Sequence, residues 1–166
     1  MKSPSADHKN DKTSPIKARE RMRSVAKSAP ELEQRALDAR AKAYAPYSKF
    51  HVGAAVQVNG HIFTGVNVEN ASYPLSVCAE RNAIASAVMN GVMNGVMNGK
   101  VGLEAVVVAT GASPPSAPCG GCRQVLREFA ADPAKVRVTA INPAGERRSW
   151  TLAQLLPDSF SGKELP

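Results

Sequence analysis

The sequence predicts an α/β fold in which one mixed sheet of about five strands is covered by helices on both faces, giving three α-β-α layers. Segments with the helical period of apolar residues alternate along the chain with short segments typical of strands. Residues 103–109 form a nearly continuous apolar run, as expected of a central strand buried on both faces. Helices must therefore pack on each side of the sheet.

Before this central strand, the pattern predicts a helix, a hairpin and a second helix. The Asn59-Gly60 pair favours a tight hairpin turn, and Pro46 ends the first helical stripe. The expected elements are a helix from near Pro30 to Tyr44, strands over residues 51–58 and 62–68, and a helix over residues 78–88.

After the central strand, a loop rich in Ser and Pro leads to a third helix, a strand, a short edge strand and a last helix. Thr151 is typical of a helix N-cap, and Pro157 stops the helix that follows it. The expected ranges are 111–118 for the loop, 119–129 for the helix, 136–141 and 147–150 for the strands, and 152–156 for the last helix.

The net charge of +7 belongs mainly to the N-terminal segment. Residues 1–29 contain eight Lys or Arg and three acidic residues, whereas residues 30–166 contain thirteen and eleven. The segment has no aromatic residue, so we expect a disordered basic tail ahead of one domain over residues 30–166. We interpret this tail as a solvated segment, and the alternative interpretation is that it binds RNA or an anionic surface.

Residues 89–99 repeat the unit Met-Asn-Gly-Val. A four-residue period matches no stacking repeat, and Asn-Gly favours turns. We therefore expect a duplicated loop insert that leaves the rest of the domain intact.

The three cysteines of the chain and one glutamate have the spacing of a single metal site. Cys78 opens the run Cys78-Ala79-Glu80-Arg81, and Cys119 and Cys122 follow further along the chain. Three thiolates leave one position of a tetrahedral zinc open, which is typical of catalytic sites, and Glu80 is placed to move protons there. Iron also accepts thiolates, and a disulfide between Cys119 and Cys122 is the competing interpretation.

Each half of this motif is expected where a helix begins. Helix N-termini favour the thiolate form of cysteine. Arg81 can donate hydrogen bonds to a thiolate sulfur and offset its charge, and Arg123 is a weaker candidate for the same role. The alternative for either arginine is a surface ion pair that contributes little.

Five motifs of the chain carry a family resemblance. They are Tyr47-Ser48-Lys49-Phe50-His51-Val52-Gly53-Ala54-Ala55, Gly65-Val66-Asn67-Val68-Glu69-Asn70-Ala71-Ser72-Tyr73, Cys78-Ala79-Glu80-Arg81, Pro118-Cys119-Gly120-Gly121-Cys122-Arg123-Gln124-Val125 and Leu155-Leu156-Pro157-Asp158-Ser159-Phe160. With these motifs in order, residues 31–161 resemble the small homotetrameric cytidine deaminases.

The resemblance implies a Zn²⁺ ion held by the three cysteines, with Glu80 as the proton carrier of a hydrolytic deamination. The products would be uridine or 2′-deoxyuridine and ammonia, in pyrimidine salvage. The residues it implies around the nucleoside are Phe50 on the base, Asn67 and Glu69 on the ribose hydroxyls, the backbone of Ala79 on the base, and Ala71, Tyr73 and Phe160 near a neighbouring subunit of the homotetramer.

A nucleoside is the expected partner, and neither nucleic acid nor a membrane is. The domain lacks a basic groove with interleaved aromatic residues, and no apolar run reaches the length of about 18 residues that a membrane helix needs. Because a secretory signal pattern is also lacking, we expect a cytoplasmic enzyme. The alternatives are a deaminase of another cytosine nucleoside, such as an antibiotic, and an RNA-binding protein with a structural zinc.

Overall fold

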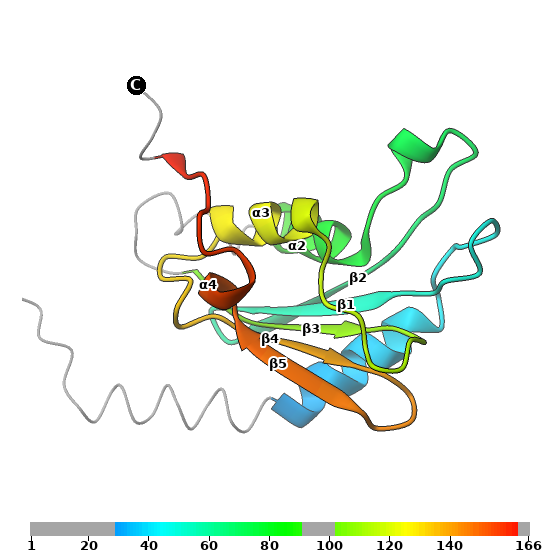
Figure 1. Ribbon diagram of the computed structural model, residues 1–166, viewed down its shortest axis with the longest axis horizontal. Helices are drawn as coiled ribbons and strands as arrows, with labels where there is room; N and C mark the ends of the chain where they lie inside the picture. The colour runs from blue at the N-terminus through cyan, green and yellow to red at the C-terminus, as the bar shows by residue number, and fades with distance from the viewer. Residues whose placement is uncertain (1–28, 91–101, 163–166) are drawn as a thin grey trace, which may run out of the picture.

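The computed structural model describes residues 29–90 and 102–162, which form a five-stranded sheet between helices (Figure 1). The strands follow the order β2-β1-β3-β4-β5 across the sheet. Only the β3–β4 pair is parallel among these strands, so the sheet is mixed, as predicted. The strands are β1 (Gly53–Val58), β2 (His61–Val66), β3 (Leu103–Ala109), β4 (Arg137–Ile141) and β5 (Arg147–Thr151).

The helices lie on both faces of the sheet, which confirms the predicted three layers. The helix of residues 29–40 covers one face, and α2 and α3 cover the other (Figure 1). The labelled helices are η1 (Tyr73–Leu75), α2 (Ala79–Met89), α3 (Gly120–Glu128) and α4 (Leu152–Leu155).

Strand β3 is buried on both of its faces, as its apolar run predicts. Val106 and Val108 belong to the core under α2 and α3. Ala105 and Val107 belong to the core under the helix of residues 29–40. The central strand therefore joins the two halves of the hydrophobic core.

Two local predictions at chain reversals are confirmed. Asn59 and Gly60 have positive φ angles of 54° and 75°, as a tight turn between antiparallel strands requires. The side chain of Thr151 accepts a hydrogen bond from the Gln154 amide, within a capping box at the start of α4.

The first helix is shorter than predicted, because it ends at residue 40 and not near Tyr44. The backbone of Tyr44 is instead hydrogen-bonded to the segment that follows β2. Its amide donates to Asn67 O at 3.0 Å, and its carbonyl accepts from Glu69 N at 2.9 Å. Strand β2 likewise ends at Val66, two residues before its predicted limit. The long-range bridge between these segments replaces the last turn of the helix.

Helix α2 lies against β2 through a contact that only glycine permits. A Cβ atom on Gly65 would lie 2.3 Å from Ala83 N and 2.4 Å from Ala79 O. These are backbone atoms and cannot move aside by a side-chain rotation. The small residue in β2 therefore sets how closely the N-terminal half of α2 approaches the sheet.

Two predictions lie outside the described residues, namely the disorder of residues 1–28 and the repeat beyond Asn90. Residue 29, the predicted end of the tail, opens the first helix. Within residues 29–90 and 102–162, no helix combines the length and apolarity needed to cross a bilayer.

Candidate metal centre and adjoining pocket

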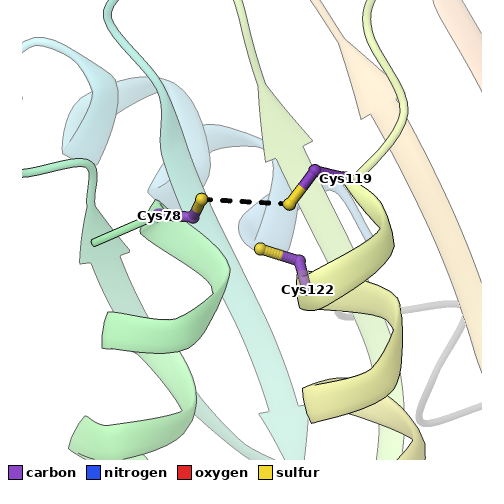
Figure 2. Close-up of side chains that lie close together, drawn as sticks. All are labelled: Cys78, Cys119 and Cys122. Carbon is purple, nitrogen blue, oxygen red and sulfur yellow. Dashed lines mark hydrogen bonds between the residues drawn. The ribbon is translucent and has the colours of Figure 1, made fainter. Parts of the chain in front are cut away.

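The structure brings the three predicted cysteine ligands together from two helices. Cys78 is the N-cap of α2, Cys119 is the N-cap of α3, and Cys122 lies in the first turn of α3. Their sulfur atoms all lie within 4.8 Å of one another. Figure 2 shows the three side chains pointing toward a common point, with 4.0 Å between the sulfurs of Cys78 and Cys119.

The donor set fits a zinc ion. Zinc–sulfur bonds of about 2.3 Å in a tetrahedral arrangement place the sulfurs about 4 Å apart, close to the separations found here. All three cysteines are free, so the competing disulfide between Cys119 and Cys122 is not formed. The burial of the cysteines is unequal, since Cys122 is buried, Cys78 is half-buried and Cys119 is exposed. The site is therefore packed on one side and open on the other.

Hydrogen bonding between the thiols makes one of them acidic. The Cys122 thiol lowers the pKa of Cys78 to about 6, against the opposing effects of burial and of the Glu80 charge. The same hydrogen bond, followed by burial, raises the pKa of Cys122. Of this pair, Cys78 is therefore the first to become a thiolate, and a bound divalent cation would favour deprotonation of the others.

Glu80 lies in the first turn of α2 and is almost fully buried, with 4% of its surface exposed. Burial raises the pKa of its carboxyl group, because the charged form is poorly solvated there. A carboxyl group that gains and loses a proton more readily near neutral pH suits proton transfer. The neighbouring Ala79 is fully buried, so its backbone is fixed in the same turn.

Arg81, the predicted hydrogen-bond donor to sulfur, has an exposed side chain in the first turn of α2. The pKa of Cys78 is lowered first by the Cys122 thiol and, to a smaller extent, by the charge of Arg81. Arg81 thus acts on the thiolate at least through its charge.

A pocket with a volume of about 470 Å³ adjoins Cys78, whereas Cys119, Cys122 and Glu80 are not among its lining residues. Its size is in the range of small-molecule sites. The lining includes Cys78, Asn67, Glu69, Tyr47, Ser48 and Tyr73. Cys78 therefore connects the metal centre to a cavity that also contains two of the residues predicted to bind ribose.

In the structure, Asn67 holds the chain just before β1. Its side-chain oxygen accepts from Val52 N at 2.8 Å, and its Nδ2 donates to Phe50 O at 2.9 Å. These bonds use one of the two Nδ2 hydrogens. The second hydrogen and the remaining lone pair on the oxygen can still serve a ligand.

Glu69 fixes the loop that contains Tyr47 and Ser48 through hydrogen bonds to its carboxylate. Its Oε2 accepts from Tyr47 N at 2.9 Å and from Ser48 N at 3.1 Å, and its Oε1 accepts from the Ser48 hydroxyl. The Ser48 hydroxyl, ahead of the backbone amides of Tyr47 and Ser48, lowers the pKa of Glu69. The carboxylate is thus ionised and oriented by the protein.

Ser48 is a site residue that the sequence reasoning did not single out. Its hydroxyl donates to Glu69 and accepts from Phe50 N at 2.9 Å, so it joins the carboxylate to the residue predicted to stack on the base. A serine two residues before a backbone amide is a common local motif, and this signal could have identified the bond to Phe50. The pairing with Glu69 spans 21 residues and has no such local signal.

Of the remaining residues predicted to bind the nucleoside, Tyr73 is the one that lines the pocket. Phe50 is 42% exposed and Tyr73 is 71% exposed, and the Tyr73 ring meets the Tyr47 ring edge to face at 6.1 Å between centroids. Phe50, Ala71, Ala79 and Phe160 are not part of the pocket lining. The exposed Phe160 is attached to α3 through its carbonyl, which accepts from Gln124.

Comparison with known proteins gives consistent results. Residues 27–140 match the family model of the cytidine and deoxycytidylate deaminase zinc-binding region. The chain is 38% identical over 135 residues to a cytidine deaminase of Halalkalibacterium halodurans, covering 81% of this chain and 95% of that protein. It is 41% identical over 128 residues to a cytidine deaminase of Sporosarcina psychrophila, covering 76% and 87% of the two chains.

Solved structures agree with the sequence matches. The crystal structure of a cytidine deaminase from Burkholderia pseudomallei superposes with a TM-score of 0.70 at 44% identity, covering 80% of this chain and 98% of that one. A cytidine deaminase from Mycobacterium tuberculosis gives a TM-score of 0.63 at 37% identity, covering 79% and 95%. The similarity thus extends over nearly the whole of these proteins.

Proposed function

Because the chain belongs to the family of the cytidine and deoxycytidylate deaminase zinc-binding region, we propose that it hydrolyses cytidine and 2′-deoxycytidine to uridine and 2′-deoxyuridine, releasing ammonia. The observation that carries this function is the combination of three convergent cysteine sulfurs with the buried carboxyl group of Glu80. A purely structural zinc site would normally have a fourth protein ligand and no need of a buried acid beside it.

The residues of the chain account for the proton transfers of the reaction. Cys78, Cys119 and Cys122 would hold the zinc, which when bound supplies a Lewis acid that makes a water molecule easier to deprotonate. Glu80 takes a proton from the attacking water and delivers it to N3 of the pyrimidine. The oxygen adds to C4, and the Glu80 carboxylate then takes the second proton from the new C4 hydroxyl group and passes it to the amino nitrogen as the C4–N bond breaks. Water and cytidine are thus converted to uridine and ammonia.

The pocket residues supply orientation and substrate choice. Phe50 stacks on or against the edge of the base, and the backbone of Ala79 contacts it. Asn67 offers its second Nδ2 hydrogen, and Glu69 offers the remaining lone pair of its Oε1, to the ribose hydroxyls. A base without ribose leaves these polar groups unpaired, so free cytosine is a poor substrate. Cytosine compounds with a strongly altered sugar would leave the same polar groups unpaired, so they are disfavoured as substrates.

The oligomer we propose is a homotetramer in which a neighbouring subunit completes the pocket near Ala71, Tyr73 and Phe160, of which Tyr73 already lines the pocket within one chain. The segment that carries η1 extends beyond the end of the sheet (Figure 1), and it presents Tyr73 and Leu75 with 71% and 66% of their surfaces exposed. Apolar side chains on an extended segment favour burial against another chain. Light scattering on the purified protein would give four times the monomer mass, whereas a monomeric mass would exclude the assembly.

The catalytic domain is proposed to span residues 30–166, with residues 1–29 as a separate basic tail. Three free thiols at one site need a reducing compartment, which supports a cytoplasmic enzyme acting in pyrimidine salvage. Arg81 is proposed to partly neutralise the thiolates, since its charge lowers the pKa of Cys78 after the larger effect of the Cys122 thiol.

One assay tests the proposed function. The purified protein is incubated with cytidine, 2′-deoxycytidine and cytosine, and the loss of cytosine absorbance is followed. Both nucleosides should react, and the free base should react far more slowly. Glu80→Gln should retain zinc and lose roughly 10²–10⁴-fold in kcat, the usual contribution of a positioned acid–base group.

Glu128→Gln is the matched control, because Glu128 is exposed at the end of α3. It should behave as wild type in both assays. A zinc-loaded wild-type protein without activity on either nucleoside would refute the function, and an active Glu80→Gln variant would remove Glu80 from the mechanism.

A further inference from the structure

The chain that carries Cys119 into the metal centre has few side-chain contacts of its own. Gly120 and Gly121 follow it, and a Cβ atom on either glycine would have no atom within 4 Å. Cys119 itself is exposed. Two adjacent glycines also give the backbone the most freedom to move. Within this turn, Cys119 is held by its carbonyl, which accepts from Arg123 N at 3.0 Å, so any further restraint on the sulfur must come from outside the turn.

Arg123 provides such a connection. Its Nε donates to Pro118 O at 2.7 Å, and its Nη1 donates to Leu155 O at 2.9 Å. Pro118 is fully buried and directly precedes Cys119. One half-buried guanidinium thus ties the backbone ahead of a metal ligand to the end of α4, 32 residues away from the arginine.

The same side of α3 holds more of the C-terminal segment. Gln124 Nε2 donates to Phe160 O at 2.8 Å, and Arg127 Nε donates to Ser159 Oγ at 3.0 Å. Neither of these bonds reaches Pro118 or a cysteine. Among the three side chains, Arg123 is thus the one that connects the C-terminal segment to the residue before Cys119.

We propose that Arg123 is a positioning residue for the metal centre, which holds the Cys119 sulfur at ligand distance by joining the Pro118 carbonyl to the C-terminal segment at Leu155. This role rests on the zinc site proposed above. The planar guanidinium can serve two carbonyl groups in fixed directions at once, whereas an ammonium group lacks this geometry. Without the guanidinium, Cys119 keeps the backbone hydrogen bond from residue 123 but loses the connection through Pro118 to the C-terminal segment.

The test measures how fast zinc leaves the full-length protein. Wild type, Arg123→Gln, Arg123→Lys and Arg127→Gln are loaded with zinc and mixed with an excess of a chromogenic chelator. Loss of a residue that orients a metal ligand typically costs roughly 10–100-fold in metal affinity. Arg123→Gln should therefore release zinc at least roughly tenfold faster than wild type, and Arg123→Lys should lie between the two.

Arg127→Gln is the matched control, since it removes a second guanidinium from the same helix and the same C-terminal segment. Its zinc release should match that of wild type. Cobalt substitution gives a spectroscopic reading of the ligands: the thiolate-to-cobalt band should weaken or shift in Arg123→Gln and stay unchanged in Arg127→Gln.

Equal release from Arg123→Gln and wild type, or equal acceleration in Arg123→Gln and Arg127→Gln, would overturn the positioning role. If Arg123→Gln does not fold, Arg123→Lys decides: a wild-type release rate with an unchanged cobalt spectrum refutes the role. A wild-type protein that takes up no zinc would refute the metal site itself, which is a different failure.

Discussion

The hydroxyl group of Ser48 links two residues that are proposed to contact the substrate. It accepts from Phe50 N and donates to the Glu69 carboxylate, so a single oxygen orients both a proposed base contact and a proposed ribose contact. Such a residue acts through others and does not need to touch the substrate.

Replacing Ser48 with Ala should weaken substrate binding and leave the metal centre intact. A hydrogen bond to a charged group contributes about 1.5–3 kcal/mol, so we expect KM to rise by roughly tenfold or more. Ser48→Thr, which keeps the hydroxyl, should recover most of the loss. Steady-state kinetics and zinc content check this. A wild-type KM in Ser48→Ala would exclude the proposed link.

The pH dependence of stability should contain a contribution from Glu69. The Ser48 hydroxyl and the nearby amides lower the pKa of Glu69 in the folded protein below its ordinary value of 4.5. These bonds therefore stabilise the fold at pH values above 4.5, and their effect is lost as the pH falls through the lowered pKa of Glu69. The stability difference between wild type and Glu69→Gln should be largest near neutral pH and shrink below 4.5. Urea unfolding over this range measures it, and a constant difference would contradict it.

At the residue level, the sequence predicts positions that share one helix or turn, but it does not predict individual hydrogen bonds between distant segments. Cys119 and Cys122 could be predicted because their spacing alone places both at the start of one helix. The bonds from Arg123 to Leu155 and from Ser48 to Glu69 join segments far apart in the chain. They become visible only once the sheet has fixed the positions of those segments.

At the scale of elements, the most consequential contact is the one between β2 and α2 at Gly65. The helix carries Cys78 at its N-cap and Glu80 in its first turn, so its distance from the sheet determines where both groups lie. The sequence predicted both elements with nearly correct limits. Their separation could not be read from a periodic pattern, because periodicity gives the buried face and not the depth of packing.

Gly65→Ala should move α2 and disturb the site. Its Cβ would meet Ala83 N and Ala79 O at 2.3 and 2.4 Å, and these backbone atoms can yield only if the helix shifts. Overpacking of this kind costs roughly 1–3 kcal/mol, so we expect a lower Tm together with a lower kcat. Thr64→Ala, at an exposed neighbouring position in β2, is the control. Thermal unfolding and kinetics that match wild type in Gly65→Ala would show that α2 adapts without a cost.

The end of the first helix shows where local patterns fail at this scale. The apolar stripe predicted a helix reaching Tyr44, but Tyr44 bonds to Asn67 and Glu69, far along the chain. Helical propensity is a weak preference that tertiary contacts override.

In the molecule as a whole, the metal centre joins two halves of the fold. Cys78 follows the β1–β2 hairpin, and Cys119 and Cys122 follow β3, so one ion would cross-link α2 to α3 above the sheet. A ligand that binds only the folded state adds to its stability according to its concentration and affinity.

Zinc removal should therefore lower both activity and stability. With a strong chelator, we expect activity to disappear and the Tm to fall, because stabilisation by a ligand at a thousand times its Kd is about 4 kcal/mol. Added zinc should restore both quantities. Cys119→Ala serves as the control, since its Tm should respond little to the chelator. A wild-type Tm that is insensitive to chelation would contradict the cross-linking role.

The direction of α2 has a consequence for protein engineering. Its N-terminus belongs to the metal centre, and its C-terminus at Met89 lies eleven residues further on, about 16 Å along the helix axis. The end of α2 at Met89 is therefore an attachment point about a helix length from Cys78. A reporter domain or an affinity tag joined at Met89 would be separated from this metal ligand by the whole helix, which makes the position suitable for biosensors and immobilised enzymes.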